Sequence, residues 1–257
     1  MKSGNNPTVS IVVPVYNAAR FLDETIASVQ AQTLTNWELI LVDDYSIDES
    51  TKIVKKHANS DDRIRLIQNK QNSGAAISRN AGIDAAEGKY LAFLDADDLW
   101  HPEKLEKQVA FMREKDCAFS FTGYEFADTT GKPNGKKVNV PATITYKQAL
   151  KNTTISTPSV MLDLDKINKM VLYMPNIRRG QDTAAWWKIL KVTHFAYGLN
   201  EILFYYRRSG NTLSSNKLTA IQRTWNLYRS VERLNAARSI YYFTWYAFNA
   251  VRRRGFK

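Results

Sequence analysis

Through its first hundred residues the sequence alternates between short apolar runs and longer segments in which apolar residues recur at helical spacing. The runs are nearly uninterrupted, which predicts strands that are buried on both faces. Strands that alternate with helices pair in parallel through right-handed crossovers, so we expect an α/β fold with a central, mostly parallel sheet flanked by helices. The four predicted strands are Val9–Val15, Leu39–Val42, Ile64–Ile67 and Tyr90–Leu94.

An open sheet of this kind binds ligands beyond the carboxyl ends of its strands, so the polar residues that follow each run are the first candidates for a site. The alternation weakens after Asp98. A further strand is predicted over Thr157–Leu162 and a helix over Asp182–Leu190. Residues 218–257 have a helical pattern and are rich in Arg and aromatic side chains, which predicts a C-terminal helical tail.

The charge of the chain is unevenly distributed. Its 257 residues carry 36 Lys and Arg against 25 Asp and Glu, and the formal charge of +11 first suggests a nucleic acid or an anionic membrane as partner. Residues 178–257 hold 15 of the basic and 3 of the acidic side chains, so the whole excess is C-terminal. The first 177 residues are close to neutral and show no recognised nucleic-acid-binding signature, so we expect no nucleic-acid partner.

The compartment is constrained by cysteine usage and by the N-terminus. Cys117 is the one cysteine, which excludes an internal disulfide and a cysteine-based zinc site and fits a reducing compartment. Residues 1–7 are polar, so neither a secretory signal nor an N-terminal membrane anchor is expected. These features predict a cytoplasmic location.

Three carboxylates follow the fourth predicted strand, at Asp95, Asp97 and Asp98. Carboxylates at the end of a buried strand repel one another unless a cation or a bound ligand compensates them. Asp oxygens suit Mg²⁺ or Mn²⁺, and few protein ligands suffice when water and phosphate oxygens complete the coordination. The alternative is that one Asp caps the helix that begins near Pro102 and the others are solvated; for an isolated acidic trio the two interpretations carry about equal weight.

A second acidic pair, Asp43-Asp44, follows the second predicted strand. Ser46 and Asp48 can cap the next helix, but capping does not account for both members of the pair. A carboxylate at such a strand end can accept hydrogen bonds from a nucleobase or from ribose hydroxyls. Tyr16 follows the first strand and could stack on a base.

Two long segments, Ser10–Ser50 and Asn72–Gln108, resemble the catalytic core of the family 2 glycosyltransferases, which are inverting enzymes with the GT-A fold. The resemblance is dense over residues 8–110 and extends more thinly to about residue 208. Within the family the sequence is similar to bacterial surface-polysaccharide enzymes, including the teichuronic acid type. It implies a catalytic domain over residues 1–217, with a nucleotide-binding half at 8–100 and an acceptor half at 101–217, followed by the tail at 218–257.

The resemblance also implies roles for individual residues. Asp95-Ala96-Asp97 matches the DXD motif of the family, so Asp95 is expected to face the ribose and Asp97 the metal, Mn²⁺ or Mg²⁺, with Asp98 sharing either task. Asp182 resembles the catalytic base, which the chemistry requires because a sugar hydroxyl has too high a pKa to attack unaided; its alternative role is a helix N-cap. The expected nucleotide contacts are Pro14, Tyr16, Asp43, Asp44, Ser73, Gly74, Arg79 and Asp95, and Arg178, Arg179 and Arg207 are candidate phosphate contacts.

The sequence departs from the family pattern at three places. The usual Asp-Asp-Gly-Ser has Tyr45 in place of the Gly, so the approach of this turn to a ligand can differ. Gln181 replaces the Glu that precedes the catalytic Asp. Arg208 stands where many relatives carry a His after Tyr-Arg, so no histidine metal ligand is expected.

The favoured function is inverting transfer of a sugar from a nucleotide-diphosphate donor, a UDP-sugar, to a lipid-linked acceptor in the synthesis of a teichuronic acid, capsule or O-antigen type of polysaccharide. The alternative is a catalytically inactive, nucleotide-sugar-binding subunit of an assembly complex. A homodimer remains open. The tail carries no apolar run long enough to span a bilayer, since its longest uncharged run has 13 residues, Ser239–Val251.

Aromatic residues set among arginines in the tail are typical of a helix that lies at a membrane interface. This pattern predicts an anionic membrane surface as a partner of residues 218–257 and a peripheral location on the inner face of the cell membrane. The alternative is an amphipathic helix that packs on the catalytic domain or on a second subunit.

Overall fold

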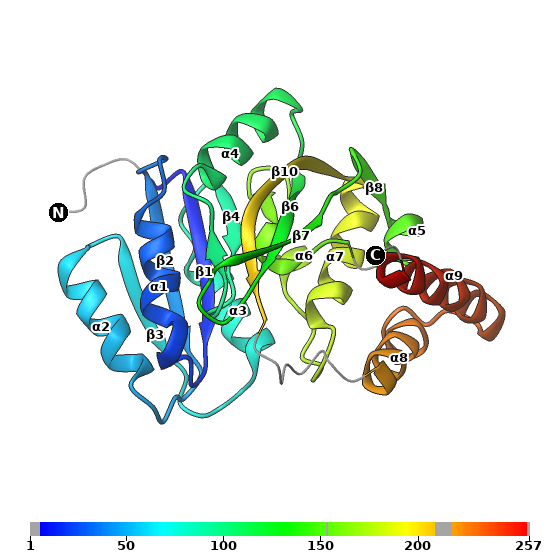
Figure 1. The fold of residues 1–257 in the computed structure, drawn as a ribbon, viewed down its shortest axis with the longest axis horizontal. Coiled ribbons are helices and arrows are strands. Elements are labelled where there is room, and N and C mark those ends of the chain that lie inside the picture. Colours follow the sequence, from blue (N-terminus) through cyan, green and yellow to red (C-terminus); the bar gives the residue numbers. More distant parts are fainter. Residues whose placement is uncertain (1–5, 153, 209–216, 256–257) are drawn as a thin grey trace.

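The computed structural model describes residues 6–152, 154–208 and 217–255, with the side chains of the last helix described as far as Asn249. The described residues form one ten-stranded sheet between two layers of helices (Figure 1). The strand order is β3-β2-β1-β4-β9-β6-β10-β5, with β7 paired to β6 and β8 to β10. The strands are β1 (Val9–Val15), β2 (Trp37–Asp43), β3 (Ile64–Gln68), β4 (Tyr90–Phe93), β5 (Leu99–Trp100), β6 (Phe119–Ala127), β7 (Pro133–Val138), β8 (Thr143–Thr145), β9 (Met161–Asp163) and β10 (Phe195–Arg207).

The pairing of the first four long strands is parallel, as predicted. β1 pairs in parallel with β2 and β4, and β2 pairs in parallel with β3. β9 is antiparallel to both β4 and β6, so β6 runs in the same direction as the N-terminal strands. The expected mostly parallel sheet flanked by helices is therefore confirmed.

The strand predicted over Thr157–Leu162 is wrong in its first half. Thr157–Ser159 forms a single 3-10 turn, η1, and the strand begins only at Met161. Pro158 has no N–H to donate to a ladder, which accounts for the late start.

Helices cover both faces of the sheet, and each face has its own apolar core. The helices are α1 (Ala19–Gln30), α2 (Ser50–Ser60), α3 (Ala75–Ala85), α4 (Lys104–Glu114), α5 (Tyr146–Ala149), α6 (Lys169–Leu172), α7 (Gln181–Thr193), α8 (Lys217–Asn226) and α9 (Ala236–Gly255), with a π-helical turn, η2 (Leu227–Val231), after α8. Ile11 packs with residues of α1, α2 and α4, whereas Val12 packs with residues of α3 and α7. Gly82 allows α3 to lie close on β1, because a Cβ there would come within 2.3 Å of Val12 Cγ1.

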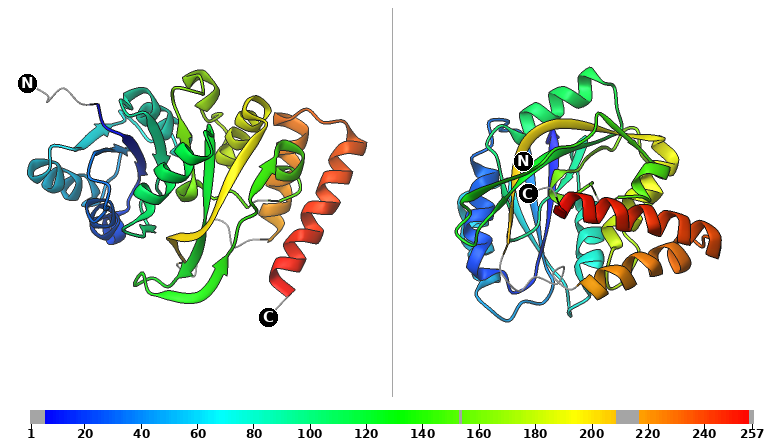
Figure 2. Two further views of the ribbon diagram at one scale, coloured as in Figure 1. Left: turned by 90° about the horizontal axis from the view of Figure 1, so that it is seen from above. Right: turned by 45° about the vertical axis from the view of Figure 1, so that its right-hand side comes forward.

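The C-terminal helices pack on the rest of the chain, against α5 and α7 (Figure 2). Tyr228 is fully buried, its ring stacks on Trp187 with centroids 5.6 Å apart, and its hydroxyl donates to the Leu150 carbonyl at 2.5 Å. The side chain of Glu232 is only 4% exposed, and it accepts from Lys191 Nζ and Tyr146 Oη, both at 2.5 Å. The side chains of Arg252–Arg254, which contributed to the membrane prediction, lie outside the described residues.

This docking predicts that replacing the buried ring destabilises the protein. Tyr228→Ala removes the stack on Trp187 and leaves a cavity, so we expect the free energy of unfolding to fall by about 3–5 kcal/mol. Urea denaturation monitored by circular dichroism measures the change. Tyr241→Ala, on the half-exposed side of α9, is the matched control and should cost less than about 1 kcal/mol. Equal losses in the two variants would contradict the packing.

Candidate functional site

The polar residues that follow β1, β2 and β4 meet at one edge of the sheet. Val15 lies opposite Asp43 in the β1–β2 register, and the Asp44 N–H donates to the Val15 carbonyl at 2.7 Å. On the other side of β1, the Leu94 N–H donates to the Val12 carbonyl at 3.1 Å. Because all three strands run in the same direction, the side chains of Tyr16, Asp43 and Asp95 emerge at the same end.

The two members of the acidic pair after β2 have different surroundings. The Asp43 carboxylate accepts from the Ser46 N–H and from the Thr51 hydroxyl, at 3.3 and 3.2 Å. Both Asp44 oxygens are used internally: Oδ1 accepts from Asn69 and from the Ser73 N–H at 2.7 and 2.9 Å, and Oδ2 accepts from the Gly74 N–H at 2.7 Å. Asp44 therefore fixes the loop that precedes α3, and of the two carboxylates Asp43 makes the longer and weaker hydrogen bonds.

Two tyrosine rings are exposed on neighbouring turns above Asp43. Tyr16 is 52% exposed and Tyr45 is 56% exposed. The turns are tied together, because Ser46 Oγ accepts from the Asn17 N–H and Asn17 Oδ1 accepts from the Ile47 N–H, each at 3.0 Å. Tyr45 has a φ of 67°, in the left-handed region that favours glycine. Sequence reasoning noted Tyr45 as a departure but did not assign it to the site, although an aromatic residue at a glycine position was the available signal.

Asp95 is paired with Arg79. Arg79 projects from α3, is buried, and places Nη2 at 2.5 Å from Asp95 Oδ1. Its Nε has no hydrogen-bond partner among the described residues. Sequence reasoning assigned Arg79 and Asp95 to the same ligand, and the structure brings them into direct contact.

The other two carboxylates after β4 differ in exposure. Asp98 is buried, its Oδ1 accepts from the Arg207 N–H at 2.9 Å, and its Oδ2 lacks a partner among the described residues. Burial, with the charges of Asp95 and Asp97, raises the pKa of the Asp98 carboxyl well above its usual range. Asp97 is exposed, yet desolvation by the surrounding chain and the charge of Asp95 raise the pKa of its carboxyl to about 6. Asp98 therefore holds β10 to this loop, while Asp97 is the open carboxylate.

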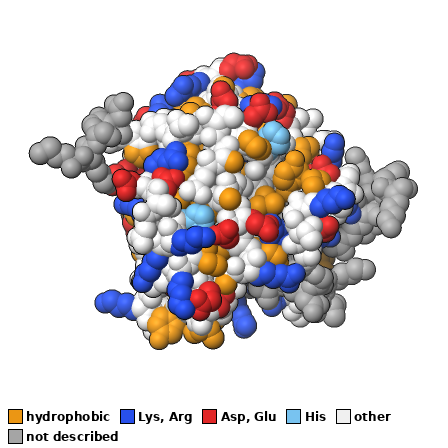
Figure 3. All heavy atoms as spheres, turned by 60° about the vertical axis from the view of Figure 1, so that its left-hand side comes forward, with side chains coloured by type: hydrophobic (Ala, Val, Ile, Leu, Met, Phe, Trp, Pro, Cys, Tyr) orange, Lys and Arg blue, Asp and Glu red, His pale blue; other side chains and the backbone are white. Residues whose placement is uncertain are grey.

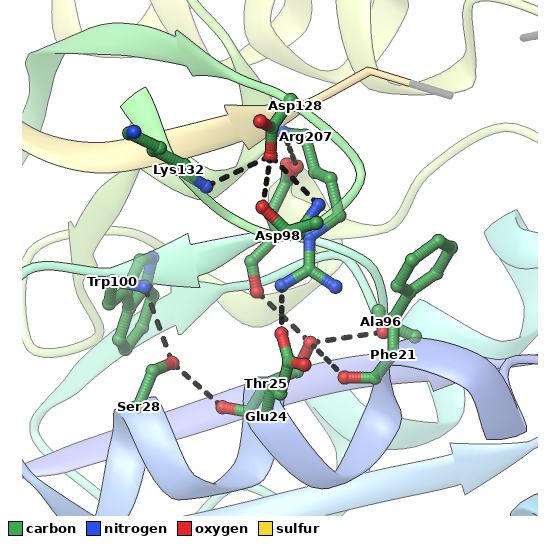
Figure 4. A network of polar contacts seen from close by, with 11 residues as sticks. Phe21, Glu24, Thr25, Ser28, Ala96, Asp98, Trp100, Asp128, Lys132 and Arg207 are labelled. Atoms are coloured by element: carbon green, nitrogen blue, oxygen red, sulfur yellow. Dashed lines mark hydrogen bonds and ion pairs between the residues drawn. The ribbon is translucent and has the colours of Figure 1, made fainter. Parts of the chain in front are cut away.

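Helix α1 supports this loop from below, as Figure 4 shows. The buried Thr25 hydroxyl lies 3.0 Å from both the Ala96 and the Asp98 carbonyl oxygens. Arg207, at the end of β10, is buried over the Phe21 ring and donates to Glu24 Oε2 at 2.6 Å. Its Nε and Nη1 have no partner among the described residues. Thr25 and Glu24 were missed by sequence reasoning, since nothing in a regular amphipathic helix marks them.

Asp182 lies in the first turn of α7, near the same end of the sheet. Its Oδ1 accepts from the Thr183 N–H at 2.8 Å, and its Oδ2 accepts from the Thr157 hydroxyl at 3.2 Å. One turn further along α7, the Trp186 ring lies 5.7 Å from Phe93, two residues before Asp95. The neighbouring turn η1 is held to the loop after β4, because Trp100 Nε1 donates to the Pro158 carbonyl at 2.9 Å.

The segment before α7 carries the remaining candidates. Arg178 and Arg179 are exposed there. Gly180, with a φ of 79°, begins the helix, and a Cβ at this position would lie 2.8 Å from Leu227 Cδ1 of η2. The C-terminal helices therefore set the position of the helix that carries Asp182.

The carboxylates fit an oxygen-ligated divalent cation only in part. In the portion of the chain that the structure describes, no three His, Cys, Asp or Glu side chains converge to hold a metal ion. Asp97, exposed and without a cationic partner at hydrogen-bond distance among the described residues, is a suitable ligand for Mg²⁺ or Mn²⁺, whereas Asp98 is enclosed. Such an ion would need further oxygens from a ligand or water, as is usual where phosphates complete the coordination.

Comparison with known proteins connects this arrangement to characterised chains. The sequence matches the family described as Glycosyl transferase family 2 over residues 10–203. It is 44% identical over 248 residues to the Bacillus subtilis protein named as a teichuronic acid biosynthesis glycosyltransferase, TuaG, covering 96% of this chain and 98% of that one. It is 35% identical over 249 residues to the Escherichia coli UDP-Glc:alpha-D-GlcNAc-diphosphoundecaprenol beta-1,3-glucosyltransferase WfgD, covering 96% and 95%.

Solved structures share the fold at low sequence identity. S. aureus TarS 1-349 in complex with UDP-GlcNAc superposes with a TM-score of 0.71 at 20% identity, over 93% of this chain and 71% of that one. The mannosyltransferase PcManGT from Pyrobaculum calidifontis, in complex with GDP-Man and Mn²⁺, gives a TM-score of 0.69 at 17% identity, over 90% and 66%.

The raised pKa of Asp97 predicts a pH-dependent gain in stability on neutralising it. A carboxyl that titrates near 6 in the folded chain and near 4 in the unfolded one destabilises the fold as pH rises between those values. Asp97→Asn should therefore raise the free energy of unfolding at pH 8 by roughly 1 kcal/mol, a value reduced for the exposure of the side chain. At pH 5 the gain should be about half as large.

Urea denaturation of both proteins at the two pH values measures this difference. A gain that is equal at pH 5 and pH 8, or a less stable variant at pH 8, would contradict the assigned surroundings of Asp97.

Proposed function

Because the chain belongs to glycosyl transferase family 2, we propose that it transfers a sugar from a nucleotide-diphosphate donor, a UDP-sugar, to a hydroxyl group of a lipid-linked bacterial surface polysaccharide. Membership of the family makes it a glycosyltransferase, and the resemblance read from the sequence, with its GT-A fold, is confirmed. The name of TuaG supports a teichuronic acid product, and the name of WfgD supports a diphospholipid acceptor. A capsule or O-antigen product stays a prediction from the sequence. The observation that carries the proposal is the placement of Asp43, Asp95, Asp97 and Asp182 at the same end of the sheet.

The nucleoside of the donor lies against the ends of β1, β2 and β4 in this proposal. Asp43 accepts hydrogen bonds from the base, Tyr16 stacks on it, and Asp95, held by Arg79, faces the ribose. Pro14 shapes the end of β1, and the Ser73-Gly74 loop, fixed by Asp44, borders the nucleotide. The TarS complex with UDP-GlcNAc supports a uridine donor for the fold.

A divalent cation, Mn²⁺ or Mg²⁺, would be held by Asp97 and by diphosphate oxygens of the donor. Bound there, it would supply Lewis-acid neutralisation of the departing diphosphate. The Mn²⁺ in PcManGT supports this choice. Asp98 is the less suited of the two predicted ligands, because it is enclosed and engaged with Arg207. Of the three arginines predicted to contact the phosphates, Arg178 and Arg179 are exposed ahead of α7 and stay candidates. Arg207 is less suited, because it is buried and already donates to Glu24.

Asp182 acts as the general base. Thr157 and the Thr183 N–H fix its carboxylate, which accepts the proton of the acceptor hydroxyl as that oxygen attacks the anomeric carbon. Attack from the face opposite the leaving diphosphate inverts the anomeric centre.

The proposed location of the enzyme is the inner face of the cell membrane. In the described part of the chain, no helix is long and apolar enough to cross a bilayer. A lipid-linked acceptor would nevertheless require the enzyme to reach the inner face of the cell membrane, and residues 218–257 are the proposed contact. On the face drawn in Figure 3, acidic and basic side chains are interspersed, as a solvent-facing surface requires.

Removing the proposed base should abolish transfer and spare binding. For Asp182→Asn we expect kcat to fall by roughly 100- to 10,000-fold, because the acceptor hydroxyl loses its proton acceptor. UDP release from UDP-sugars in the presence of Mn²⁺ and an acceptor extract measures turnover, and calorimetry with UDP measures binding.

Asp62→Asn, an exposed carboxylate on the opposite side of the molecule, should keep full activity. Retained turnover in Asp182→Asn would rule out its role as the base. Binding of UDP without turnover on any UDP-sugar, in the wild-type protein, would favour the alternative of an inactive nucleotide-sugar-binding subunit.

Tyr45 adds a second ring at the proposed nucleobase position. Tyr45→Gly should raise the melting temperature by about 2–4 °C, because glycine adopts a φ of 67° without strain. The same change should weaken UDP binding by roughly 5- to 150-fold, the range for losing one aromatic stack on a base. Binding of inorganic pyrophosphate with Mn²⁺, which has no base, should be unchanged, and Tyr45→Phe should behave like the wild type. If Tyr45→Gly binds UDP normally, the ring does not contact the base.

A further inference from the structure

A groove of about 540 Å³ lies between α5 and α9, on the side of the molecule away from α1 and α2 (Figure 1). Its α5 side is formed by Tyr146, Lys147 and Leu150, and its α9 side includes Arg238, Tyr241 and Tyr242. The groove is well separated from the carboxylates after β4, so the proposed transfer chemistry does not account for it.

Three cations border this groove. Lys147 and Arg238 line it from opposite sides, and Lys151 places Nζ 5.1 Å above the Tyr241 ring and 5.3 Å above the Trp245 ring. None of the three forms an ion pair with a residue that the structure describes. Glu232 does not balance them, because its carboxylate already forms an ion pair with Lys191 and accepts a hydrogen bond from the Tyr146 hydroxyl. The groove therefore presents positive charge with no anion from the described chain to balance it.

An apolar stripe continues from the groove along α9. Arg238, Tyr241, Trp245 and Phe248 follow one another at helical spacing on one side of the helix, and the last three are 50%, 42% and 55% exposed. Ile240, beside them, is 57% exposed. The packed side of α9 carries Ser239, Tyr242 and Tyr246 instead. We call the three residues Tyr241, Trp245 and Phe248 the aromatic stripe.

The two alternatives weighed for the tail thus apply to different sides of one helix. One side of α9 packs on the domain, and the aromatic stripe remains uncovered in the described structure. Tyrosine and tryptophan rings favour the boundary between headgroups and acyl chains, and a neighbouring lysine or arginine favours the phosphates just above it. On this surface the cations lie at the groove and the aromatic rings lie beyond it along α9. This arrangement matches the order of phosphates and acyl chains at the edge of a bilayer.

We propose that the α5–α9 groove binds the phosphate of an anionic lipid headgroup between Lys147 and Arg238, with the aromatic stripe inserted beside it at the acyl boundary. This site deepens the proposed membrane location, on which it rests, and it names the residues that make the contact. Because α9 is packed against α7 through Tyr228 and its neighbours, lipid bound here would also fix how the helix that carries Asp182 is oriented relative to the membrane.

The test is co-sedimentation of the full chain with vesicles of phosphatidylcholine alone or mixed with phosphatidylglycerol. Lys147→Glu/Arg238→Glu should lower the partition coefficient on anionic vesicles by roughly 25-fold or more, about fivefold for each charge removed from the surface. The matched control, Lys55→Glu/Lys56→Glu, makes the same change in net charge at two exposed positions of α2, far from the groove, and should lower the partition coefficient by less than about threefold. Equal losses in the two double variants would show diffuse attraction and overturn the site.

The stripe has its own readout. Trp245→Ser/Phe248→Ser should reduce partitioning at least tenfold on anionic vesicles, and in the wild type the fluorescence assigned to Trp245 by difference with Trp245→Phe should shift to the blue on vesicle addition. An unshifted spectrum would overturn insertion of the stripe. A wild-type dimer in gel filtration that Trp245→Ser/Phe248→Ser converts to a monomer would assign the stripe to a second copy of the chain and overturn the lipid proposal.

UDP binding separates this site from the proposed function. All four variants should bind UDP with wild-type affinity, because none of the substituted residues borders the carboxylates after β4. A wild-type protein that partitions to vesicles but binds no UDP would contradict the transferase and leave the lipid site standing. A wild-type protein that binds UDP but does not partition to anionic vesicles would contradict the lipid site and leave the transferase proposal standing.

Discussion

The structure depends on how three carboxylates at the end of β4 are accommodated. Asp95 is balanced by Arg79 from α3, and Asp98 is enclosed and tied to the Arg207 N–H of β10. In the described part of the chain Asp97 has no cationic partner at hydrogen-bond distance, and desolvation with the charge of Asp95 raises the pKa of its carboxyl to about 6. Two of the three carboxylates thus join distant elements, and the third, Asp97, is the one to which we assign the proposed cation.

The supporting contacts around this loop come from across the chain. Thr25 and Glu24 of α1 fix the loop and the Arg207 side chain, and Trp100 holds the turn η1, whose Thr157 fixes Asp182. Two residues of η2 contact the same helix α7: Leu227 lies against Gly180 at its N-cap, and Tyr228 stacks on Trp187. The tail therefore supports the site and, on its other side, presents the aromatic stripe.

The elements that depend on local pattern were predictable, and those that depend on tertiary contacts were not. Val9–Val15 was predicted to the residue, because a continuous apolar run has one stable arrangement between two helical layers. The enclosure of Asp98 depends on Arg207, 109 residues further on, and the role of Asp44 depends on backbone N–H groups of the Ser73-Gly74 loop, so no local pattern could reveal either. Both sides of α9 carry aromatic residues, so the sequence pattern could not show which side packs on the domain and which side is exposed.

In the proposed mechanism, Asp97 recruits the donor through a divalent cation. Calorimetric titration of UDP into the protein, with Mn²⁺ and with a chelator, tests it directly when the wild type is compared with Asp97→Ala. We expect Mn²⁺ to tighten UDP binding in the wild type and to have no effect on it in the variant. Equal UDP affinity with and without Mn²⁺ in the wild type, or an undiminished Mn²⁺ effect in Asp97→Ala, would contradict it.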